Sequence, residues 1–322
     1  MKGFYQTHKK FVLLAAMALL LSALAFGLVS CSDNTYPKKG ETNPGFPRDN
    51  TPVVLQATQP GTAVEENSKV VVDYSNISEG YICVKSFLGG TKVKVLVEVA
   101  GLRYQYTIQN TDRFITIPLS EGNGVYTVGV YEHVEGDLYA AILSLDGLSV
   151  RLDDEFSVFL YPNQVVNFSM GDKAVQLSEK LADGTTSELE ALNEIYQWVA
   201  SNIKYDEAKA ALATAGALPN YIPNNTSTID TKTGICFDYA VLTVSMLRAQ
   251  RIPARLVIGY AGGVYHAWIE VYSVETGSIG RYRFTGTKWV QMDPTFDAAN
   301  KGVVDLSGLI GSGTDYQKLF YH

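Results

Sequence analysis

Three residues in the C-terminal half of this 322-residue chain have side chains that together could perform thiol-based acyl transfer: Cys236, His266 and Asp293. In that chemistry a cysteine supplies the nucleophile, a histidine acts as its base, and a carboxylate orients the imidazole. Each of the three lies in a different kind of local sequence. Separate secondary-structure elements must therefore bring them together.

Cys236 stands at the start of a predicted helix. Apolar residues recur at helical spacing from 240 to 247, Thr233 and Gly234 are N-cap candidates, and Pro253 ends the pattern. In a first helical turn, free N–H groups and the positive end of the helix dipole stabilise a thiolate, and the same amides can donate to an oxyanion. The alternative is a buried core cysteine, which free cysteine commonly is.

His266 and Asp293 belong to a predicted run of β-strands. The segments 255–260 and 266–272 are predicted strands joined by a Gly-Gly turn, and a third strand at 288–292 delivers Asp293. If these strands are antiparallel neighbours, the carboxylate can reach the imidazole and fix its tautomer. Taken singly, an exposed histidine and an Asp-Pro turn starter are the alternatives. A zinc site is disfavoured, because no C-x-x-C or H-x-x-x-H spacing is present.

The combination of these motifs resembles the transglutaminase-like superfamily over roughly residues 185–300. The matching segments are 202–206, 234–240, 246–255, 259–260, 266–268 and 289–295. The resemblance implies a papain-like fold, in which a helix bearing the cysteine packs on an antiparallel sheet bearing the histidine and the aspartate. It assigns Cys236 as the nucleophile, His266 as the base and Asp293 as the orienting residue.

The same resemblance implies a reaction at protein or peptide amide bonds. Active members attack an amide carbonyl with a thiolate and form a thioester, which water or an amine then resolves. Hydrolysis and acyl transfer both stay open, so we expect a cysteine acyltransferase or a peptidase or amidase, without a cofactor or metal. Tyr205 is a candidate oxyanion donor. Because inactive relatives also exist, the alternative is a catalytically inactive binding lipoprotein at the cell surface.

Two regions of different pattern precede these motifs. Seven short β-type runs between residues 70 and 145, several of them alternating, predict an antiparallel β-sandwich over 67–165. The transglutaminase-like domain is expected to follow at 166–322. The predicted fold class is thus α+β, with a sandwich-like domain before a papain-like one.

The first helix of the second predicted domain has its own start signal. Ser187 and Glu190 have the spacing of a capping box, and an apolar series at helical spacing then continues to a predicted end near Asn202. A predicted loop at 206–230 separates this helix from the one that begins at Cys236. That loop is long enough to be considered as a lid over the site.

The N-terminus resembles a bacterial lipoprotein signal. Lys9 and Lys10 precede an uncharged stretch from 11 to 29, and small residues then lead into Cys31. In the lipobox that this resembles, the cysteine is lipidated and becomes the first residue of the mature chain. We expect residues 1–31 to be the signal and the globular part to lie outside the cytoplasmic membrane, anchored to it through Cys31. A transmembrane helix is the alternative, because 19 apolar residues come close to spanning a bilayer.

Residues 32–66 are polar and rich in Pro, Gly, Asn and Thr, which predicts a flexible tether. The net charge is −7, and because residues 1–30 hold three of the 26 basic groups and no acid, the remainder holds 23 basic and 33 acidic groups. So acidic a surface argues against nucleic acid as a partner.

Cys83 is expected in the core, and a disulfide to Cys236 is disfavoured because the two cysteines lie in separate predicted domains.

Overall fold

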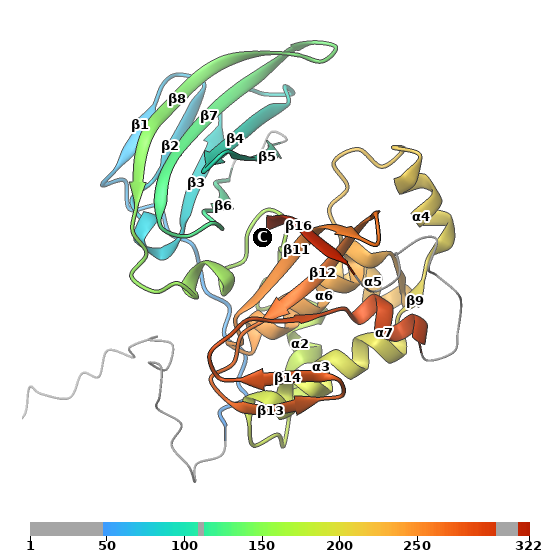
Figure 1. Ribbon diagram of the computed structural model, residues 1–322. Coiled ribbons are helices and arrows are strands. Elements are labelled where there is room, and N and C mark those ends of the chain that lie inside the picture. Colours follow the sequence, from blue (N-terminus) through green and yellow to red (C-terminus); the bar gives the residue numbers. More distant parts are fainter. Residues whose placement is uncertain (1–47, 109–112, 301–314) are drawn as a thin grey trace, which may run out of the picture. The chain divides into compact units, whose positions relative to one another are not determined.

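The computed structural model describes residues 48–108, 113–300 and 315–322 (Figure 1). The architecture combines antiparallel sheets with helices, which confirms the predicted α+β class. The predicted signal, its lipidation site Cys31 and the first part of the tether lie outside the described residues. None of the helices in the described ranges is long and apolar enough to cross a membrane.

The strands between residues 64 and 150 form two four-stranded antiparallel sheets, with the orders β1-β2-β3-β6 and β5-β4-β7-β8. Their bounds are β1 Val64–Glu66, β2 Val70–Asp73, β3 Tyr81–Ser86, β4 Val93–Val99, β5 Leu102–Ile108, β6 Ile115–Pro118, β7 Gly124–Glu135 and β8 Leu138–Val150. Burial alternates residue by residue along β4, as expected of a strand with one face on a core. Apolar side chains of both sheets share one core cluster, which gives the sandwich-like arrangement that the alternating runs predict.

The segment 48–54, which the sequence assigns to a flexible tether, is held against the helical part of the chain. The N–H of Val53 donates to the carbonyl of Ala249 at 2.8 Å, and the Asn50 amide donates to the carbonyl of Thr185 at 2.9 Å. The side chain of Val54 is buried. The amino-acid composition does not show that such a segment is packed, because extended backbone can find its hydrogen-bond partners without any periodic pattern in the sequence.

A third four-stranded sheet is antiparallel and has the order β15-β12-β11-β16. Helix α6 packs against its strands β11 and β12 (Figure 1). The helices are α2 (Lys173–Ala182), α3 (Glu188–Asn202), α4 (Glu207–Thr214), α5 (Asn225–Thr231), α6 (Cys236–Ala249) and α7 (Pro294–Asn300). The sheet strands are β11 (Ala254–Ala261), β12 (Val264–Val271), β15 (Val290–Met292) and β16 (Tyr316–Tyr321). Two short pairs complete the described strands: β9 (Lys204–Tyr205) with β10 (Thr233–Gly234), and β13 (Thr276–Ile279) with β14 (Tyr282–Thr285).

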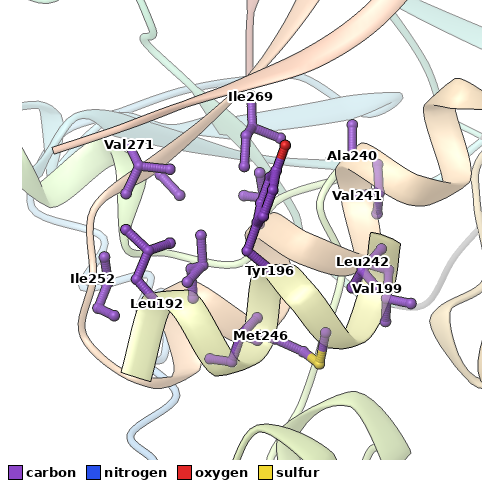
Figure 2. Packing of buried hydrophobic residues seen from close by; sticks show 14 of the residues in the cluster. Leu192, Tyr196, Val199, Ala240, Val241, Leu242, Met246, Ile252, Ile269 and Val271 are labelled. Carbon is purple, nitrogen blue, oxygen red and sulfur yellow. The ribbon is translucent and has the colours of Figure 1, made fainter. Parts of the chain in front are cut away.

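Helix α6 is the centre of this second core. Every residue from 238 to 249 is buried, so the helix is enclosed on all sides rather than along the single apolar stripe that the sequence suggests. Figure 2 shows Leu242 and Met246 of α6 near Tyr196 and Val199 of α3. A helix buried in this way holds its first residue, Cys236, at a fixed place in the fold.

Helix α3 begins where its start signal places it. The Ser187 hydroxyl accepts a hydrogen bond from the N–H of Glu190 at 3.1 Å, and the helix runs from Glu188 to Asn202. Helices α4 and α5 occupy much of the predicted loop at 206–230. They have eight and seven residues, too short for a helical period to stand out in the sequence.

Arg248 of α6 is a buried cation that three backbone carbonyls satisfy. Its guanidinium donates to the carbonyls of Tyr161 (2.8 Å), Ala254 (2.9 Å) and His322 (2.8 Å), and burial lowers its pKa. We expect Arg248→Met to destabilise the fold by roughly 3 kcal/mol, because the carbonyls lose a charged donor in the protein interior. Urea unfolding measures this loss. The matched control Arg103→Met removes an exposed guanidinium and should leave the unfolding midpoint nearly unchanged; equal midpoints for both variants would contradict the account.

Candidate active site

Cys236 is the first residue of α6, and a short parallel pair of strands sets its position. Gly234 of β10 lies opposite Tyr205 of β9, two residues before the cysteine. The N-cap is Ile235, so the prediction of Thr233 or Gly234 is wrong. The reason is that Asp238 reaches back and accepts a hydrogen bond from the N–H of Ile235 at 2.9 Å, which moves the helix start one residue along. The Cys236 side chain is partly exposed, whereas a core cysteine would be buried.

Asp238 also ties the region at 206–230 to the start of α6. Its carboxylate is buried, forms an ion pair with Lys209 at 2.9 Å and accepts a hydrogen bond from the Tyr221 hydroxyl. Gly234 is needed for this packing, since a Cβ there would lie 2.6 Å from the Cβ of Asp238. The role of Asp238 is therefore to hold together the elements around the thiol.

His266 and Asp293 meet across the sheet. Strands β12 and β15 are antiparallel neighbours, and β12 begins after a two-residue turn in which Gly262 and Gly263 have φ values of 58° and 82°. Such a turn requires positive φ at both positions, which glycine adopts freely. The His266 Nε2–H donates to Asp293 Oδ2 at 2.7 Å, and both residues are buried, with exposed fractions of 1% and 2%. The other carboxylate oxygen accepts from the N–H of Phe296 at 2.9 Å and so caps α7.

The buried pair favours the ionised form of both partners. Burial alone would lower the pKa of the His266 imidazole, but the charge and hydrogen bond of Asp293 and the nearby Cys236 side chain hold that pKa well above its ordinary value. Burial alone would raise the pKa of Asp293, but the imidazolium outweighs it and the net shift is downward. The imidazolium is therefore lost only as pH rises through its raised pKa, and the carboxylate is neutralised only as pH falls through its lowered one.

The Cys236 side chain lies near the imidazole of His266. Nδ1 of His266 is buried and forms no conventional hydrogen bond with the described residues, yet the Cys236 side chain is close enough to help raise the pKa of the imidazole. Contacts of this kind are often long before a substrate binds. Tyr205 also lies near Cys236. Burial, and then the charge of Cys236, raise the pKa of the Tyr205 hydroxyl, so this hydroxyl stays protonated and able to donate. Of the site residues that the sequence proposes, Cys236, His266, Asp293 and Tyr205 therefore lie near one another, whereas Cys31 lies outside the described residues.

Sequence reasoning missed one residue at this site. The Tyr316 hydroxyl donates to Asp293 Oδ2 at 2.8 Å, and its ring contacts Trp268 with centroids 4.9 Å apart. Tyr316 opens β16, which pairs with β11. The only signal for it in the sequence is a short β-type run at the very end of the chain.

One family model matches residues in the second half of the chain, and two curated proteins are similar to the chain over shorter stretches. Residues 175–294, which include Cys236, His266 and Asp293, match the family model described as the transglutaminase-like superfamily. A protein-glutamine gamma-glutamyltransferase of Pseudomonas aeruginosa is 34% identical over 84 residues, or 22% of this chain and 11% of its own. The protein YebA of Bacillus subtilis, whose name states that it is uncharacterised, is 31% identical over 104 residues, or 27% of this chain and 13% of its own. The chain thus spans a small fraction of the curated relatives that it matches.

Solved structures give weaker likenesses. A protein of Cytophaga hutchinsonii, provisionally named a cysteine protease, is 17% identical and aligns over 81% of each chain with a TM-score of 0.35. Red sea bream transglutaminase is 13% identical and aligns over 67% of this chain and 48% of its own, with a TM-score of 0.28. Scores this low carry no argument about function. The assignment rests on the family model, and residues 175–294 form a domain of the transglutaminase-like superfamily.

Proposed function

We propose that this chain is a cysteine-dependent enzyme that transfers or hydrolyses acyl groups at protein or peptide amide bonds. The observation that carries the proposal is the buried hydrogen bond of 2.7 Å between His266 and Asp293, beside a partly exposed Cys236 at a helix start. A nucleophile, a base and an orienting carboxylate in that relation are the recurring arrangement of acyl-transfer sites.

The reaction divides into two steps. The Cys236 thiolate attacks the amide carbonyl, His266 gives its proton to the leaving amine, and a thioester remains on the sulfur. Water or a second amine then attacks the thioester while His266 takes up a proton, which releases the acyl product and restores the thiolate and imidazolium. The negatively charged oxygen of each tetrahedral intermediate would be stabilised by amides of the first α6 turn and by the Tyr205 hydroxyl.

The proposed place of action is outside the cytoplasmic membrane, with the chain anchored through a lipid on Cys31. Its support is the sequence alone: two lysines, an uncharged stretch and small residues before a cysteine. At this location, the protein or peptide substrate would lie at the cell surface or in the periplasm.

Mass spectrometry of the protein incubated with a peptide mixture tests the activity. We expect cleaved peptides, deamidated side-chain amides or, with an added primary amine, amine-modified peptides. Prior alkylation of the protein with iodoacetamide should remove all three products. A chain that binds peptides but changes none of them would instead be the inactive binding lipoprotein.

A further inference from the structure

Asp293 has a second hydrogen-bond donor on the same oxygen that receives the imidazole. Oδ2 accepts from His266 Nε2 at 2.7 Å and from the Tyr316 hydroxyl at 2.8 Å. The tyrosine hydroxyl must be the donor in this contact, because the carboxylate beside an imidazolium is ionised and can only accept. Burial, and then the charge of Asp293, raise the pKa of Tyr316 and keep its proton in place.

The fold gives Tyr316 this position through a close approach of two strands. In the register of the sheet, Gly259 of β11 lies opposite His266 on β12 and opposite Lys318 on β16, where the β11–β16 pairing is irregular. A Cβ on Gly259 would lie 2.1 Å from the carbonyl oxygen of Gln317 and 2.8 Å from the Trp268 ring. The missing side chain therefore lets β16 approach β11 closely.

On the basis of the proposed function, we propose that Tyr316 is a positioning residue of this site, which fixes the Asp293 carboxylate and tempers its pull on the imidazolium. A carboxylate oxygen that serves two donors shares its charge between them. Without the hydroxyl, His266 would hold its proton more tightly and would be a poorer acid toward the leaving amine. Tyr316 itself need not touch the substrate.

Other polar groups surround this pair and stay in place when the hydroxyl is removed. On Asp293 these are the N–H of Phe296 and, at its own N–H, the Tyr282 hydroxyl at 3.2 Å. Tyr282 in turn donates to Asp297, which also receives the Tyr196 hydroxyl and pairs with Arg281. The remaining titratable neighbour of the imidazole is Cys236, beside which Tyr205 and Tyr265 lie, and the rings of Trp268 and Tyr316 also contact the imidazole. A change in the titration of His266 is thus attributable to the one hydroxyl that the variant lacks.

The test is Tyr316→Phe, which keeps the ring on Trp268 and removes only the hydroxyl. The chain has four histidines, so ¹⁵N-histidine NMR can follow His266 directly, with His266→Ala to identify its signal. We expect its titration midpoint to rise by roughly half a pH unit and its Nε2–H proton to move downfield. In turnover we expect kcat to fall roughly threefold to tenfold with KM nearly unchanged. Tyr131→Phe, on β7 of the sandwich-like part of the chain, is the matched control and should change none of these.

The outcomes separate this inference from the proposed function. If Cys236 of the parent protein is inert to iodoacetamide and no peptide is altered, the proposed function fails, and the NMR measurement still reports on the hydroxyl. If the parent is active and Tyr316→Phe titrates and turns over as the parent does, only the role of Tyr316 is overturned. Gly259→Ala offers a second route: by pushing β16 away it should move the His266 midpoint in the same direction.

Discussion

Cys236→Ala is expected to abolish turnover, by roughly a thousandfold or more, because no other group can form the thioester. The structure supports this choice of cysteine over the other described one. Cys236 is partly exposed and lies beside an imidazole, whereas Cys83 is buried in β3. Both are free, in agreement with the expectation that they form no disulfide.

Two measurements check this prediction. Alkylation with iodoacetamide near neutral pH should label Cys236 rapidly and selectively, and His266→Ala should slow that labelling, because the imidazolium that stabilises the thiolate is gone. Cys83→Ala is the matched control and should keep both the labelling and the turnover. Full activity in Cys236→Ala would sink the proposed mechanism, while retained peptide binding without any parental turnover would favour the binding lipoprotein.

Replacements of Asp293 are expected to form a graded series. Asp293→Ala should lower kcat roughly 10²- to 10⁴-fold, because the imidazole loses the acceptor that fixes its tautomer and the charge that stabilises its protonated form. Asp293→Asn should retain more activity, since an amide oxygen still accepts from Nε2–H, as in related triads that end in asparagine.

The same series separates the catalytic role of Asp293 from its structural one. Asp293 also caps α7 through the N–H of Phe296, and asparagine is an equally good N-cap whereas alanine is not. Unfolding measurements should therefore show Asn close to the parent and Ala about 1 kcal/mol less stable. If Asp293→Asn, which keeps the cap of α7 but lacks the charge, also keeps the full kcat of the parent, the carboxylate has only a structural role.

Local pattern determined much of this protein from its sequence. The capping signal at Ser187 placed the start of α3, alternation placed the strands of the sandwich, and the glycine pair at 262–263 placed the hairpin before His266. These features depend on the conformational preferences of neighbouring residues, which a sequence displays directly. The order of cysteine, histidine and aspartate along the chain was visible for the same reason.

Tertiary structure alone decided which distant groups meet. The packing of residues 48–54 near the end of α6, the burial of α6 on all sides and the arrival of β16 beside β11 all join segments far apart in the chain. Strand order and register set these contacts, and a short segment encodes neither, because many partners satisfy the same apolar and hydrogen-bonding needs. The second donor on Asp293 was invisible for that reason: Tyr316 acquires its meaning only when β16 pairs with β11.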